Sequence, residues 1–157
     1  MLLAPAPLAA GHVLSLFDSG VPALDDWLRR RAASNQSAGA SRTYVVSGED
    51  MRVVGYYAIA SGALSILEAP SRIKRNMPDP IPMAILGRLA VDRTAQGQGL
   101  GRAMLQDCVL RVRQAANIMG IRGLLVHAIS DDAQRFYERH GFTPSPTNPA
   151  TLILSIA

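Results

Sequence analysis

The feature that most constrains this chain is a glycine-rich turn between an apolar segment and an amphipathic one. Residues 86–105 read LGRLAVDRTAQGQGLGRAML, and the turn is the QGQGLG of residues 96–101. Three glycines in five positions let the backbone approach a ligand closely. A helix that starts there directs unpaired N–H groups and the positive end of its dipole into the turn. Because that arrangement binds anions, the stretch predicts a strand, a phosphate-binding loop and a helix.

Three phosphate-binding motifs compete for this turn. A Walker A loop requires Lys followed by Ser or Thr after its last glycine, whereas Arg102 and Ala103 stand there. A dinucleotide fingerprint requires Gly-x-Gly-x-x-Gly, whereas the glycines here are spaced Gly-x-Gly-x-Gly. The order Gln-x-x-Gly-x-Gly, from Gln96 to Gly101, remains. On its own it fits a structural helix start as well as a phosphate site.

Apolar periodicity divides the rest of the chain into strands and helices. It predicts strands at residues 42–47, 52–61, 63–68, 83–91, 123–130 and 151–156, a short edge strand within residues 2–10, and helices at residues 22–37, 98–119 and 133–140. Four prolines make residues 69–82 a loop. The strand–helix–strand unit of residues 83–130 must be parallel and right-handed. We therefore expect an α/β or α+β fold with a central mixed, mostly antiparallel sheet flanked by helices.

Local signals set the ends of the expected helices. Pro22 opens the first, because proline suits the first helical turn. Gly120 ends the second. Either Asp131 or Asp132 caps the third, which Gly141 terminates.

Composition limits the class of protein. The chain has 157 residues, of which 48% are apolar, so we expect one folded domain over residues 1–157. No apolar run reaches the about 18–20 residues that a membrane span needs. The single cysteine, Cys108, excludes an internal disulfide and suits a reducing cytosol. It falls in the apolar stripe of a helix, where we expect it to be buried.

The net charge of +4 is unevenly distributed. Residues 1–70 carry five basic and six acidic side chains, a net of −1, whereas residues 71–139 carry eleven basic and six acidic, a net of +5. Phosphates at the glycine-rich turn would use part of this excess, and a polyanionic substrate would use the remainder. The alternative is a solvated basic surface. For residues 29–31 that surface is a helix face, with Asp25 and Asp26 placed for i,i+4 ion pairs.

A second motif is the AQRFYERHGF of residues 133–142. Phe136 and Phe142 are typical core residues, whereas Tyr137 carries a hydroxyl that can donate or accept a proton. On its own, a tyrosine on a short helix is more often a packing residue.

Together the two motifs resemble those of the GNAT N-acetyltransferases, over the chain from Tyr44 onward. The resemblance implies a GNAT fold with a parallel β-α-β unit for acetyl-CoA, a single acetyltransferase domain and no metal. It also implies that Tyr137 lies beside the coenzyme A sulfur and protonates the departing thiolate. The residues expected at the cofactor are Leu89, Ala90 and Val91 along the pantetheine arm, and Gln96, Gly97, Gln98, Gly99, Leu100, Gly101 and Arg102 around the pyrophosphate.

The chain is similar in more detail to the acetyltransferase toxins of type II toxin–antitoxin systems. The matching stretches are FDSGVPALDDWL at residues 17–28, NQ at 35–36, ASRT at 40–43, GYY at 55–57, LGRLAVD at 86–92 and FYER at 136–139. This resemblance implies a cytoplasmic homodimer that acetylates the α-amino group of aminoacyl-tRNA and halts translation. It further implies an antitoxin with a ribbon–helix–helix domain. The residues expected at the tRNA are Arg29, Arg30, Arg72, Lys74, Arg75, Arg88 and Arg93.

Two catalytic features stay unassigned. Family members often have Asn seven residues before the tyrosine, at a pantetheine contact, and here that residue is Ser130. No convincing general base is present, since His12, His127 and His140 are candidates by residue type only, and His127 falls in an expected core strand. An unperturbed α-amino group titrates at about 7.7–8.0, so it is partly neutral near pH 7 without a base.

Two other functions stay open at this level. The first is a GNAT enzyme that acetylates a protein or small-molecule amine. The second is a non-catalytic regulator that binds acetyl-CoA, against which the intact turn and Tyr137 both count.

Overall fold

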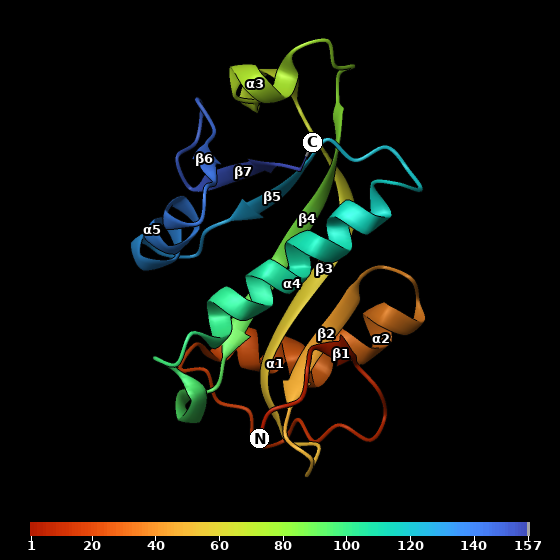
Figure 1. The fold of residues 1–157 in the computed structure, drawn as a ribbon, viewed down its shortest axis with the longest axis vertical. Helices are drawn as coiled ribbons and strands as arrows, with labels where there is room; N and C mark the ends of the chain where they lie inside the picture. The colour runs from red at the N-terminus through yellow and green to blue at the C-terminus, as the bar shows by residue number, and fades with distance from the viewer. Residues whose placement is uncertain (157) are drawn as a thin grey trace. The chain divides into compact units, whose positions relative to one another are not determined.

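The computed structural model describes residues 1–156, which form strands, helices and two 3-10 turns. In chain order these are β1 (Ala6–Pro7), α1 (Pro22–Arg30), α2 (Ala32–Ser37), β2 (Arg42–Ser47), β3 (Val53–Leu64), the 3-10 turn η1 (Ile66–Glu68), α3 (Ser71–Lys74), β4 (Ile81–Val91), the 3-10 turn η2 (Arg93–Ala95), α4 (Leu100–Ala115), β5 (Gly123–His127), α5 (Asp131–Arg139), β6 (Thr143–Pro144) and β7 (Thr151–Ser155) (Figure 1). The strand order is β1-β2-β3-β4-β5-β7-β6. Contacts divide the chain into two compact units, residues 1–60 with 87–108, and residues 61–86 with the chain from Val109 onward.

The first unit packs helices against an antiparallel part of the sheet. β1 pairs with β2, and β2 pairs with β3, both antiparallel (Figure 1). The core between these strands and the helices consists of Leu8, Phe17, Leu28, Ala32, Val45, Val53, Tyr56 and Ala90. The expected single helix of residues 22–37 is in fact two, because Arg31 leaves the helical conformation at φ −122° and ψ −30°. The break lets the Gln36 side chain bond the backbone of Leu8 and Thr43, at 2.9 and 3.0 Å.

The second unit contains the parallel pair that the sequence predicts. β4 and β5 run parallel from Met83↔Gly123 to Leu86↔Val126, and β7 pairs antiparallel with β5 and β6. The core of this unit consists of Leu64, Ala69, Ile73, Ile81, Met83, Leu125 and Ile153. The mixed, mostly antiparallel sheet is therefore confirmed.

The expected separate strand at residues 63–68 is wrong. β3 continues through Gly62 to Leu64, and η1 follows, with the Ser65 hydroxyl accepting a hydrogen bond from the Leu67 N–H. Gly62 serves close packing and not a turn, because a Cβ built there lies 2.2 Å from Cδ1 of Ile85. The expected loop at 69–82 also contains one short helix, α3.

Two of the expected helix ends and one strand end need correction. α4 ends at Ala115, because the Asn117 N–H bonds the Gln114 carbonyl three residues back and tightens the chain before Gly120. Ser130, and neither aspartate, caps α5 by accepting a hydrogen bond from the Ala133 N–H at 3.1 Å. β5 stops at His127 and does not reach residue 130.

None of the helices described within residues 1–156 is long and apolar enough to cross a bilayer.

α4 approaches β3 closely at Gly55. A Cβ built on Gly55 lies 3.0 Å from Sδ of Met104 and 3.2 Å from Cδ2 of Leu100, the first residue of α4. Nearby, the Tyr57 hydroxyl donates a hydrogen bond of 2.5 Å to Oδ2 of Asp107 on the same helix. These contacts fix α4, and hence its N-terminus, on the strand.

We predict that side chains at Gly55 destabilise the first unit in order of size. Gly55→Val is expected to lower the free energy of unfolding by about 1–3 kcal/mol through overpacking, and Gly55→Ala by less. Gly11→Ala is the control, because a Cβ there has an ordinary contact of 3.5 Å with Met51. Urea unfolding measures all three, and a Gly55→Val variant as stable as the wild type would refute the close packing.

Candidate active site

The glycine-rich turn forms an open backbone cradle at the N-terminus of α4. Gly97 and Gly99 have φ angles of +76° and +81°, which favour glycine, and a Cβ built on either has no neighbour within 4 Å. The helical bond nearest the turn runs from the Ala103 N–H to the Gly99 carbonyl at 3.1 Å. The N–H groups of residues 100–102 therefore precede the regular helical bonds. The turn has both the space and the donors that a pyrophosphate needs.

Gln96 fixes the entry to this turn with its side chain. Its Nε2 donates to the carbonyls of Val91 and Ser19, each at 2.9 Å. The amide hydrogens thus hold the end of β4 and the N-terminal segment together. Of the expected cofactor residues, Gln96 is therefore a scaffold side chain in the first unit.

Asp92, directly after β4, is a buried carboxylate with donors on both oxygens. Oδ1 accepts from the Asp18 N–H at 2.8 Å, and Oδ2 accepts from the Thr94 N–H at 3.0 Å and hydroxyl at 2.6 Å. The Nη2 atom of Arg52 lies 3.7 Å from Oδ2. Burial alone would raise the pKa of Asp92, but the hydrogen bonds from Thr94 and Asp18 and the charge of Arg52 lower it below its ordinary value.

The segment of residues 17–20 contacts Arg93 of η2, which precedes the glycine-rich turn. Nε of Arg93 lies 3.1 Å from Oδ1 of Asp18, and the Arg93 N–H donates to the Asp18 carbonyl at 2.8 Å. The hydrogen bonds from Arg93 and from the Gly20 N–H lower the pKa of the Asp18 carboxyl. On its other side, the segment bonds α1, where the buried Asp25 accepts from the Ser19 N–H and hydroxyl, the latter at 2.6 Å.

A cation–π contact places Arg88 of β4 over an aromatic cluster. Its guanidinium carbon is 4.4 Å from the centroid of the Trp27 ring, which stacks on Tyr56. The Tyr56 hydroxyl donates to the Leu24 carbonyl at 2.7 Å, and burial raises its pKa. Arg88 is thus half-buried and engaged with α1.

Tyr137 lies in the second unit, on α5, and only 6% of it is exposed. Its ring packs edge-to-face on Phe136 and Phe142, with centroids 5.2 and 5.3 Å away. Phe142 is buried, as expected of a core residue, whereas Phe136 is only half-buried. Ser130 stands where family members often have an asparagine. Its hydroxyl caps α5, which is a structural role.

The seven basic residues expected at the tRNA fall into two groups. Arg29, Arg88 and Arg93 already make contacts within the first unit: Nη1 of Arg29 donates to the Phe17 carbonyl at 2.7 Å, and Nη2 pairs with Asp26 at 3.2 Å. The expected i,i+4 pair of Asp25 with Arg29 is therefore wrong, because Asp25 binds Ser19 instead. The other group consists of Arg30, Arg72, Lys74 and Arg75, which are exposed, as Arg29 and Arg93 also are.

Three of these exposed cations lie at the short helix α3 in the second unit. Arg72 and Lys74 are part of the helix, and Arg75 directly follows it. Arg122 holds the helix by donating from Nε to the Ile73 carbonyl at 3.1 Å and from Nη2 to the Arg72 carbonyl at 3.0 Å. Arg122 was not among the expected functional residues. Its partners lie about fifty positions away in sequence, so no local pattern indicates them.

Burial and contacts place the three histidines and the cysteine. Nδ1 of His12 accepts a hydrogen bond from the Ala9 N–H at 3.0 Å. His127 is exposed, contrary to the expectation of a core residue, because it occupies the last position of β5. Its Nδ1 lies 3.0 Å from the Thr151 hydroxyl, and Nδ1 of His140 lies 2.7 Å from the Phe136 carbonyl. Cys108 is fully buried, as predicted, and burial raises the pKa of its thiol to about 12, so it is not a nucleophile near neutral pH.

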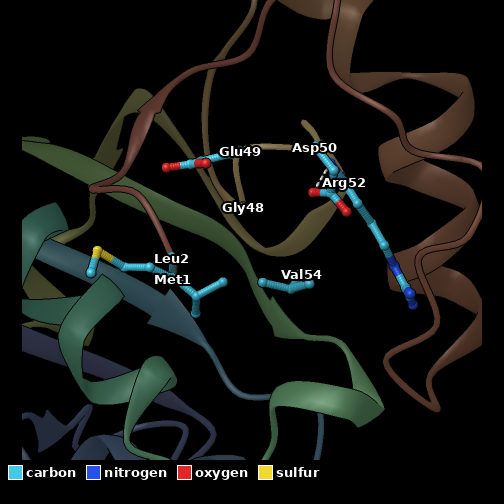
Figure 2. A pocket seen from close by; sticks show the side chains of 7 residues that line it. All are labelled: Met1, Leu2, Gly48, Glu49, Asp50, Arg52 and Val54. Carbon is cyan, nitrogen blue, oxygen red and sulfur yellow. Dashed lines mark hydrogen bonds between the residues drawn. The ribbon is translucent and has the colours of Figure 1, made fainter.

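The first unit contains a pocket of about 390 Å³, and none of its lining residues belongs to the glycine-rich turn. It is lined by Met1, Leu2, Gly48, Glu49, Asp50, Arg52 and Val54. Figure 2 shows that the Arg52 side chain extends away from Glu49, and its guanidinium pairs with Asp92. Two acidic side chains remain in the lining, so this pocket does not suit the phosphates of a cofactor. No cluster of potential metal ligands occurs within residues 1–156.

Comparisons with known proteins agree with this geometry. The family model described as Acetyltransferase (GNAT) domain matches residues 40–144. A protein named tRNA-acetylating toxin, from Mycobacterium tuberculosis strain H37Rv, is 48% identical over 151 residues, which cover 96% of this chain and 90% of that protein.

Two solved structures extend the likeness across nearly the whole chain. AtaT complexed with acetyl-methionyl-tRNAfMet is 30% identical, with a TM-score of 0.91, and 99% of this chain and 95% of that chain are covered. An AtaT toxin variant bound to the C-terminus of the antitoxin AtaR and acetyl-CoA is 28% identical, with a TM-score of 0.83 and coverage of 99% and 94%.

We predict that the Asp92 carboxylate makes the folding stability of the protein depend on pH in the acidic range. Because its folded-state pKa lies below the ordinary 3.8, its contribution is complete above about pH 4 and is lost as the pH falls through the folded value. Asp92→Asn should therefore lower Tm at pH 6 and flatten the fall of Tm between pH 4 and 2. Parallel pH profiles for variant and wild type would contradict this.

Proposed function

This chain belongs to the GNAT acetyltransferase family, and we propose that it is the toxin of a type II toxin–antitoxin system. The proposed reaction transfers acetyl from acetyl-CoA to the α-amino group of aminoacyl-tRNA, which blocks translation. The observation that carries this proposal is the 48% identity, over 96% of the chain, to a tRNA-acetylating toxin. The cradle at Gly97 and Gly99 supports acetyl-CoA as the donor.

In the proposed complex, backbone N–H groups from Gly97 to Arg102 hold the pyrophosphate at the start of α4. Leu89, Ala90 and Val91 would lie along the pantetheine arm. They follow Leu86, where the register between β4 and β5 ends, and a backbone N–H among them would stabilise the developing oxyanion. Bound acetyl-CoA supplies the activated thioester.

Tyr137 is the proposed general acid. Its O–H would donate a proton to the thiolate that departs when the amine nitrogen bonds the carbonyl carbon and the C–S bond breaks. The proton that the nitrogen loses in forming the amide would restore the Tyr137 O–H. The burial of the ring against Phe136 and Phe142 supports a fixed hydroxyl with little water around it. The amine needs no protein base, since about a tenth or more of an α-amino group is neutral near pH 7. Positioning would supply most of the rate.

The proposed tRNA surface is led by the four exposed cations, Arg30, Arg72, Lys74 and Arg75. They would contact phosphates, which gives affinity that depends on salt and not on sequence. Arg29, Arg88 and Arg93 belong to the proposed set as well, but phosphate would compete there with Asp26, Trp27 and Asp18 respectively.

The proposed assembly follows the toxin relatives. We propose residues 1–157 as one acetyltransferase domain, which forms a homodimer and acts in the cytoplasm, where its substrate is found. The partner would be an antitoxin with a ribbon–helix–helix domain. A neighbour bound to the antitoxin AtaR supports such a partner.

Transfer of radiolabelled acetyl from acetyl-CoA to total charged tRNA tests this function. Label is expected on charged tRNA only, and hydrolysis of the aminoacyl ester should remove it. Equal label on uncharged tRNA, or none on either with acetyl-CoA still bound, would reject the tRNA substrate.

We predict that Tyr137→Phe lowers turnover by about 10²–10⁴-fold, the usual worth of a positioned acid. The ring contacts stay, so Tm and acetyl-CoA affinity should hold. Tyr44→Phe, a hydroxyl deletion on β2 in the other unit, is the control and should keep full turnover. Single-turnover assays decide, and unchanged turnover of Tyr137→Phe would remove the acid role.

We also predict that Arg72→Ala with Arg75→Ala weakens tRNA binding and reduces the slope of log K against log salt by about 1–2. The matched control is Arg113→Ala with Arg139→Ala, which removes the same charge from exposed residues outside the proposed set. Filter binding at several salt concentrations gives both slopes. If the two double variants behave alike, α3 does not contact tRNA.

A further inference from the structure

We propose that Asp92 is a positioning residue for the acetyl-CoA pyrophosphate, which locks the cofactor turn to the N-terminal segment of residues 17–20. The inference rests on the proposed function, because it takes acetyl-CoA as the ligand of the turn. It assigns a task to a side chain that does not itself touch the cofactor.

The position of Asp92 in the chain makes this task possible. It directly follows β4 and precedes η2, which leads to Gln96 and the cradle. Its residue is 1% exposed, so a carboxylate is buried within a few residues of a site for phosphate. Such a charge would repel the cofactor unless donors of its own neutralise it. The hydrogen bonds from Asp18 and Thr94 stabilise the carboxylate, and the positive charge of the nearby Arg52 offsets its negative charge.

The two carboxylate oxygens serve different parts of the chain. Oδ2 binds Thr94 and so fixes the first turn of η2 after β4. Oδ1 binds the Asp18 N–H, 74 positions away in sequence. Asp92 thus joins the two segments by a single side chain, as the Gln96 amide also does through the Val91 and Ser19 carbonyls. Both oxygens of Asp92 act as acceptors, so neither can be replaced by a donor.

Two further hydrogen bonds connect the chain after β4 to the segment of residues 17–20 and restrain it. The Arg93 N–H donates to the Asp18 carbonyl at 2.8 Å, and Nε2 of Gln96 donates to the Ser19 carbonyl at 2.9 Å. The segment is anchored in turn to α1, through Asp25 and through Arg29, whose Nη1 binds the Phe17 carbonyl. The start of the cofactor turn is therefore held by α1 through the segment of residues 17–20.

A positioning role for Asp92 and a merely structural role predict different effects on donor binding. If it positions the turn, its loss should weaken binding of the pyrophosphate half of the donor. The pantetheine half, expected along Leu89–Val91, should be recognised as before. A donor without pyrophosphate, acetyl-pantetheine, distinguishes the two cases.

The test is Asp92→Asn, which keeps the size of the side chain but turns an NH₂ group toward a backbone N–H in either orientation. Calorimetric titration should give a Kd for acetyl-CoA raised about tenfold or more. In transfer assays, kcat/KM should fall likewise with acetyl-CoA and stay within about twofold with acetyl-pantetheine. Glu49→Gln, an exposed carboxylate of the β2–β3 turn, is the control and should change neither.

A second variant keeps the proposal testable if Asp92→Asn does not fold. Thr94→Val removes the hydroxyl bond to Oδ2 from an exposed residue, and a smaller shift of the same kind is expected. Equal losses with both donors, or an unchanged Kd for acetyl-CoA, would overturn the positioning role. A wild-type protein that binds acetyl-CoA but acetylates no tRNA would sink the proposed substrate and leave this inference standing.

Discussion

A buried carboxylate at the end of β4 is the interaction on which the proposed site depends. Asp92 receives hydrogen bonds from Asp18 and Thr94 and faces Arg52. Through them it fixes the chain between the strand and the helix, which is the stretch proposed to hold the pyrophosphate. The close contact of α4 with Gly55 sets the other end of that stretch. The cradle between these two anchors can stay open because neither anchor uses its backbone.

The proposed acetyl transfer has few chemical requirements, and the residues of this chain fit them. Acetyl transfer to an amine requires an anchored donor, an oriented thioester and a proton for the thiolate. The first unit holds the anchoring turn, and the second holds Tyr137 among aromatic rings. A buried thiol with a pKa of about 12 leaves no acyl-enzyme route through Cys108. This agrees with the proposed direct transfer from acetyl-CoA to the amine.

Local patterns predicted what local physics determines. The glycines of the turn, the apolar period of α4, the parallel β4–β5 pair and the burial of Cys108 are confirmed. Partners far apart in sequence were not predictable: Asp92 binds Asp18, and Gly62 accommodates Ile85 where a turn was expected. Spacing alone also paired Asp25 with Arg29, although Ser19 competes successfully for that carboxylate. Which arginines stay free for tRNA therefore required the structure.

The most direct test of the central claim is to locate the acetyl group on the product. Charged tRNA is incubated with the protein and acetyl-CoA and digested with a nuclease, and the 3′-terminal aminoacyl-adenosine is analysed by fragmentation mass spectrometry. One acetyl group is predicted on the α-amino nitrogen of the amino acid. Acetyl on a nucleobase, a ribose or a side-chain amine, or an unmodified aminoacyl-adenosine, would contradict it.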